Sequence, residues 1–177
     1  MIEIERYLNS VQTMSAKFIQ ISATGKVETG IIFFKNPDRL RFEYDKPLEN
    51  IILANGPSLI LFDKKSPKIP QKYLTSQTPL SFLLKDPIQL NDSRFVKKIA
   101  VEQNLFHLSL HDKERPKLGE IELLFANNPI EFKEWVITSF SGEKTRLLFE
   151  DIQVNQPVPE SLFNIQKQIE SFLKDAN

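Results

Sequence analysis

The sequence predicts a mainly β fold, with about ten strands and two or three helices. Short runs of β-branched and aromatic residues recur along most of the chain, and turn-forming clusters such as Asn36-Pro37-Asp38 separate them. No repeat or low-complexity linker divides the sequence, so we expect one domain over residues 1–177. A sheet of this many strands can bury its apolar face by closing, or partly closing, on itself.

The composition argues against several classes of function. The 23 basic and 23 acidic side chains cancel, which leaves no basic footprint for nucleic acid. Cysteine is absent, which excludes disulfides, thiolate nucleophiles and cysteine metal ligands. The longest apolar runs, such as 31–34, are far shorter than the roughly 20 residues that span a bilayer, so we expect a soluble protein.

The first element is predicted to be an amphipathic helix from about Ile2 to Thr13. Ile4, Leu8 and Val11 follow the i, i+4, i+7 spacing of one helix face, and polar residues lie between them. After this helix the apolar period changes from that of a helix to that of a strand.

The strands that follow are bounded by turn residues. The clearest is Arg39 to Asp45, where Leu40, Phe42 and Tyr44 share one face and charged residues share the other. The remaining strands are predicted at about 16–21, Val27–Lys35, Ile51–Ala54, Leu59–Asp63, Arg94–Glu102, Leu105–His111, Gly119–Ala126, Glu131–Ser139 and Thr145–Val154.

A second, very apolar helix is predicted from Thr78 to Lys85. Thr78 stands in the capping position before a proline, and Leu80, Leu83 and Leu84 follow at helical spacing. The tail from Gln166 to Asn177 is either a helix or frayed chain. Helices in such a fold have one obvious place, the mouth or interior of the sheet.

No motif in the sequence supports catalysis, a metal site or a cofactor. His107 and His111 are the only histidines, and on a strand they lie about 13 Å apart on its polar face, where we expect them to be exposed. Ser141-Gly142 lacks the Gly-x-Ser-x-Gly pattern of a nucleophile elbow, and no phosphate-binding glycine loop is present. We therefore predict a protein that is not an enzyme.

Several segments together resemble the LolA family of outer-membrane lipoprotein carrier proteins, over about residues 4–165. The main ones are GIIFFKNPDRLRFEYDKP at 30–47 and IILANGPSLILFD at 51–63. Shorter matches precede and follow them at 14–20, 77–82, 140–142 and 162–163. No single piece is diagnostic, but their order and spacing are those of the family.

The resemblance implies an incomplete antiparallel β-barrel of ten or eleven strands with a helical lid. It also implies a monomeric periplasmic carrier that binds the acyl chains of lipoproteins. Such a carrier ferries them from an inner-membrane releasing transporter to an outer-membrane acceptor. The N-terminus as given carries no signal peptide, which in a periplasmic protein would have been removed.

Ten apolar residues are the candidates for the lining of a lipid-binding cavity. On the helices these are Leu8, Val11, Leu80, Phe82 and Leu83, and on the strands Phe34, Leu40, Phe42, Ile60 and Phe62. We expect the helices to fill the cavity when it is empty, because full burial of three acyl chains would bind too tightly for a reversible carrier. Ordinary core packing is the alternative explanation for each residue.

One position departs from the family. The family commonly has Arg-Pro where this chain has Asn36-Pro37, and that arginine helps to latch the lid. Arg39 or Arg41 is then the candidate lid latch. Leu40 is also aliphatic where some members are aromatic, and the family's proline is absent after Phe163.

Two other functions fit the same sequence. A generic binder of hydrophobic ligands would share the cavity without partners that handle lipoproteins, and a non-catalytic β-rich adaptor would have a filled interior. A basic loop at 63–68 either docks a membrane-bound partner or carries ordinary solvated charge.

Overall fold

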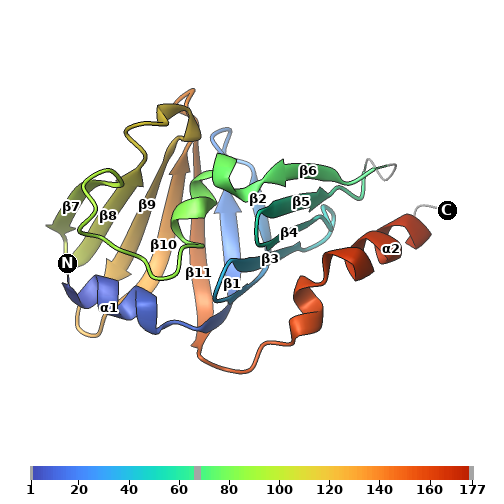
Figure 1. The fold of residues 1–177 in the computed structure, drawn as a ribbon, viewed down its shortest axis with the longest axis horizontal. Coiled ribbons are helices and arrows are strands. Elements are labelled where there is room, and N and C mark those ends of the chain that lie inside the picture. The colour runs from blue at the N-terminus through green and yellow to red at the C-terminus, as the bar shows by residue number, and fades with distance from the viewer. Residues whose placement is uncertain (1, 66–68, 176–177) are drawn as a thin grey trace.

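The computed structural model describes residues 2–65 and 69–175, and its centre is one eleven-stranded antiparallel sheet (Figure 1). The strands follow the order β6-β5-β4-β3-β2-β1-β11-β10-β9-β8-β7. The sheet curves, but its two edge strands, β6 and β7, do not pair. The predicted fold class, an incomplete antiparallel barrel with a helical lid, is confirmed.

The element bounds are as follows. The strands are β1 (Thr13–Ile21), β2 (Val27–Lys35), β3 (Arg39–Tyr44), β4 (Ile51–Asn55), β5 (Ser58–Phe62), β6 (Gln71–Leu74), β7 (Val96–Glu102), β8 (Leu105–His111), β9 (Glu120–Ala126), β10 (Glu131–Thr138) and β11 (Lys144–Val154). The helices are α1 (Ile2–Ser10), α2 (Ile165–Asp175) and the short 3-10 turns η1 (Thr75–Gln77), η2 (Pro79–Phe82), η3 (Pro116–Leu118) and η4 (Glu160–Phe163).

Apolar residues bury both faces of the sheet around β3 to β5. On the inner face, Ala54 of β4 pairs with Leu59 of β5, and both join the main core with α1 and η2. On the outer face, Leu53 pairs with Ile60, and both join a second core that α2 covers. In Figure 1, α1 lies across the ends of β8 to β10, whereas α2 lies apart, beside β3.

The helices differ from their predictions at their ends. α1 stops at Ser10 instead of Thr13, because Thr13 already pairs with Lys35 as the first residue of β1. The predicted helix at Thr78–Lys85 is only the 3-10 turn η2, preceded by η1. Its proline does occupy a first-turn position, but the Thr78 hydroxyl donates backwards to the Thr75 carbonyl and caps nothing.

One strand was missed, and one ambiguity is resolved. β6 is a four-residue edge strand whose side chains are all exposed, so it has no apolar alternation to detect. The tail forms α2, whose buried Phe172 packs against the outer core.

Candidate ligand cavity beneath the lid

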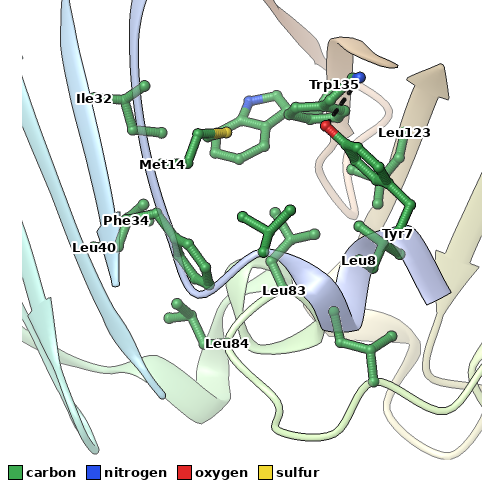
Figure 2. Close-up of a pocket in the computed structure, with 13 residues that line it drawn as sticks. Tyr7, Leu8, Met14, Ile32, Phe34, Leu40, Leu83, Leu84, Leu123 and Trp135 are labelled. Carbon is green, nitrogen blue, oxygen red and sulfur yellow. Dashed lines mark hydrogen bonds between the residues drawn. The ribbon is translucent and has the colours of Figure 1, made fainter. Parts of the chain in front are cut away.

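An apolar pocket lies between the inner face of the sheet and the helical segments (Figure 2). Its volume is about 70 Å³. It is lined by Tyr7, Leu8, Val11, Met14, Ile32, Phe34, Leu40, Leu83, Leu84, Ile88, Leu123, Phe132 and Trp135. An engineered apolar cavity of roughly 150 Å³ is what holds one benzene molecule, so the pocket at rest is too small for a long acyl chain.

Two side chains supply polar atoms to this apolar lining. The Tyr7 hydroxyl accepts a bond of 3.4 Å from the Phe132 backbone N–H, and burial raises the pKa of Tyr7. Trp135 is only 2% exposed, and its indole N–H has no partner among the described residues. Rings of Phe42, Phe132 and Phe149 surround the Trp135 ring instead. The pocket therefore favours apolar contents over charged ones.

Side-chain hydrogen bonds join two separate segments into one lid. The Asn9 amide donates to the Ile88 carbonyl at 2.9 Å and accepts from the Ile88 N–H at 2.8 Å. The Glu5 carboxylate accepts the Leu90 N–H at 2.7 Å. These bonds tie α1 to the chain before β7, and we use "the lid" for residues 2–10 together with 79–90.

The lid meets the sheet at a polar joint. The Asn155 side chain donates to the Ser10 carbonyl at 3.0 Å and accepts from the Gln12 N–H at 2.8 Å. The Asn155 N–H in turn donates to the Thr13 carbonyl. This joint marks the point at which the direction of the chain changes from α1 to β1.

The structure brings together half of the predicted cavity residues. Leu8, Val11, Phe34, Leu40 and Leu83 all line the pocket. Three more belong to the same core but do not reach the pocket. These are Leu80 and Phe82 in η2, and Phe42, whose ring packs edge-on to Trp135.

Ile60 and Phe62 lie elsewhere than expected. Both point to the outer face and pack in the second core, where Phe62 contacts the ring of Phe172 at 5.4 Å between centroids. The run at 59–62 is apolar throughout because β5 is buried on both faces, and such a run carries no alternation that tells one face from the other.

Both candidate latch arginines also lie on the outer face. Arg41 is 7% exposed and donates to the Leu162 carbonyl and to the Gln168 side chain, at 3.1 and 2.9 Å. Arg39 pairs with Glu160. Their recorded contacts reach the C-terminal segment and not the lid, which corrects the expected latch. Asn9 and Glu5 instead join the two segments of the lid to each other.

Several lining residues were not predicted. Leu123, Phe132 and Trp135 come from β9 and β10, the half of the sheet that the family resemblance left without cavity residues. Alternation was the available signal, because Ile121, Leu123 and Phe125 are buried on one face of β9. Met14 continues the buried alternation of Ala16 and Phe18 in β1, whereas Ile88 lies in a loop outside any regular apolar pattern.

The histidines are less exposed than predicted. The His107 ring lies 2.8 Å from the Glu122 carboxylate, and Nδ1 of His111 is buried. Within the described ranges, no cluster of three or more histidine or carboxylate side chains is arranged to hold a metal ion. No helix in the same ranges is long and apolar enough to cross a membrane.

The predicted basic loop is described only in part. Residues 66–68 lie outside the described chain. Within the described part, Lys64 lies 3.4 Å from Asp175 of α2, and the Lys65 N–H donates to Asp63.

An open, curved antiparallel sheet with an apolar pocket under helical segments defines the class of protein, an incomplete β-barrel with a helical lid. The sequence is more specific. The family model described as outer membrane lipoprotein carrier protein LolA matches residues 9–166, and this chain belongs to that family.

Individual relatives agree with the family match. An outer-membrane lipoprotein carrier protein of Coxiella burnetii (strain CbuK_Q154) is 25% identical, over 93% of this chain and 81% of the relative. The Pseudomonas paraeruginosa (strain DSM 24068 / PA7) protein of the same name is 24% identical, over 88% and 78%.

Solved structures share the fold at low identity. A LolA superfamily protein from Nitrosomonas europaea has a TM-score of 0.52 at 12% identity, over 94% of this chain and 98% of that one. A putative outer membrane lipoprotein-sorting protein domain from Vibrio parahaemolyticus has a TM-score of 0.54 at 10% identity, over 96% of each.

Proposed function

We propose that this protein is a periplasmic lipoprotein carrier that holds acyl chains in the lidded pocket and catalyses no reaction. The observation that carries the proposal is the pocket itself, an almost wholly apolar space closed by a separate lid. Family membership and the printed names of the relatives support the same role. The partners we propose are acylated lipoproteins, a releasing transporter in the inner membrane and an acceptor in the outer membrane.

In the proposed mechanism the lid exchanges places with the ligand. Leu8, Leu83 and Leu84 fill the space at rest, and the lid swings about the Asn155 joint as acyl chains enter. Each buried CH₂ yields about 0.8 kcal/mol, so several chains would bind almost irreversibly if nothing opposed them. Loss of the resting lid contacts offsets part of that gain. Directed transfer then follows decreasing free energy between donor, carrier and acceptor.

The test is native mass spectrometry of the protein mixed with a triacylated lipoprotein, or with the same lipoprotein lacking its acyl chains. The expected result is a one-to-one complex with the acylated form alone. No complex with either form would contradict the proposal and favour the β-rich adaptor. Binding of free lipids but not of the lipoprotein would favour the generic lipid binder.

A matched pair of variants places the ligand. Phe34→Arg puts a charge into the pocket, whereas Ile31→Arg puts the same charge on the outer face of the same strand, where Ile31 is already 40% exposed. We expect Phe34→Arg to abolish the complex and Ile31→Arg to preserve it. Equal binding by both variants would exclude this pocket as the site.

A further inference from the structure

A second pocket of about 230 Å³ adjoins the main one and differs from it in charge. Ile88 lines both pockets, so the two spaces share a wall at this lid residue. Phe82, Leu90 and Leu110 make part of the second lining apolar, and Lys85, Asp92 and Arg94 add charge. The main pocket has no charged lining residue.

Lys85 is the cation of this second pocket that lacks a counter-ion. Its ammonium lies 3.5 Å from the centroid of the Phe95 ring, and among the described residues no carboxylate lies within ion-pair distance of it. Partial burial lowers the pKa of Lys85 and outweighs the opposing effect of the Asp92 and Asp112 carboxylates. The residue is nevertheless exposed enough for an ion to reach it.

The carboxylates nearby are already engaged. Asp92 holds the Arg94 side chain at 2.7 Å and accepts the Arg94 backbone N–H. Asp112 accepts from the Arg115 side chain at 2.7 Å and from the N–H groups of Glu114 and Arg115. These pairings leave Lys85 without an ion-pair partner of its own, although Asp92 and Asp112 act on it at longer range. Its ammonium can therefore donate a charge-assisted hydrogen bond to an incoming anion.

We propose that the second pocket binds the anionic end of a single-chain amphiphile, with a carboxylate or phosphate against Lys85. The acyl chain would run past Ile88 into the main pocket. This inference rests on the proposed function, because it requires that the main pocket accept an acyl chain. It adds a ligand class, free anionic lipids, that the lipoprotein role does not include.

The experiment compares three probes that share a 14-carbon chain: myristate, myristyl alcohol and 1-myristoyl lysophosphatidylglycerol. Affinities are measured by isothermal titration calorimetry for the unmodified chain, Lys85→Gln, Lys85→Arg and Lys72→Gln. Lys72 is an exposed lysine on β6, and its replacement removes the same charge away from both pockets. Circular dichroism checks that each variant is folded.

We expect the unmodified chain and Lys72→Gln to bind an anionic probe about tenfold more tightly than the alcohol. Lys85→Gln should lose the preference for an anionic probe and keep its affinity for the alcohol. Lys85→Arg should retain most of the preference for an anionic probe. A preference for myristate alone would identify a carboxylate site, and a preference for the lysophospholipid alone a phosphate site.

Two results would overturn the inference. One is equal affinity of the unmodified chain for all three probes, and the other is an anion preference that survives in Lys85→Gln. If the triacylated lipoprotein still binds in either case, the carrier function stands without the anion site. If neither the probes nor the lipoprotein bind, both proposals fail.

Discussion

Glu160 illustrates at the residue scale how the C-terminal segment is fixed to the sheet. Its carboxylate bridges Lys35 of β2 and Arg39 of β3. Hydrogen bonds from these two cations lower the pKa of Glu160 below its ordinary value of 4.5. The two ion pairs of Glu160 therefore stabilise the fold. This stabilisation is fully present above the ordinary pKa of 4.5 and is lost as the pH falls through the lowered pKa of the folded state.

We expect the Tm difference between the unmodified chain and Glu160→Gln to be constant from pH 7 to pH 5.5 and to shrink only below roughly pH 4.5. Because Glu160 is exposed, the difference should be small. Thermal unfolding followed by circular dichroism measures it, and Glu3→Gln is the control because Glu3 is an exposed glutamate on α1, away from the C-terminal segment. A difference that already falls between pH 7 and pH 5.5 would contradict this assignment.

The sequence predicted which side chains face the inside of the sheet where apolar and charged residues alternate along a strand. It failed where both faces of a strand are apolar. Leu40 was placed correctly because charged neighbours in β3 mark the opposite face. Ile60 was misplaced because β5 is apolar on both sides, and only α2, which covers its outer side, tells the faces apart. Asn9 carries no sequence signal at all, since its role depends on a residue 79 positions away.

At the scale of elements, the lid behaves as one body only if its two segments stay joined. Asn9→Ala removes both bonds to Ile88 and leaves a partly buried N–H and carbonyl without partners, at a cost of about 1–3 kcal/mol. We therefore expect faster amide hydrogen exchange in residues 2–10 and in 84–90, with little change in the strands.

Hydrogen exchange read by mass spectrometry tests this coupling. Glu3→Ala is the control, because it changes an exposed residue of the same helix. Faster exchange in α1 alone would mean that the two segments open separately, and the lid would then not be a single unit.

Helices and strands were predicted only where a short stretch of sequence carries a regular apolar period. α1 and the strands of high apolar content were found, since each has a regular period. η2 ends at Phe82, so the leucine spacing over 80–84 predicted a longer helix than the chain forms. α2 was left ambiguous although a signal was available, since Ile165, Ile169 and Phe172 follow the i, i+4, i+7 spacing of one helix face.

At the scale of the whole molecule, one substitution in each core can distinguish an effect on ligand binding from an effect on stability. Leu84 is 7% exposed and fills the main pocket from the lid, whereas Leu53 is fully buried in the outer core. Truncation of either to alanine should destabilise the fold by roughly 2–4 kcal/mol. Only Leu84→Ala should also favour the ligand-bound state.

The reason is that Leu84 competes with the acyl chain for the same space, so its loss weakens the empty state more than the filled one. We expect Leu84→Ala to bind an acylated lipoprotein more tightly than the unmodified chain, by up to about tenfold, and Leu53→Ala to bind it equally. Urea unfolding gives the stabilities, and titration by native mass spectrometry gives the affinities. If both variants lose affinity in proportion to their lost stability, then the lid does not act as a competing plug, and ligand binding must depend on a pocket that is already open.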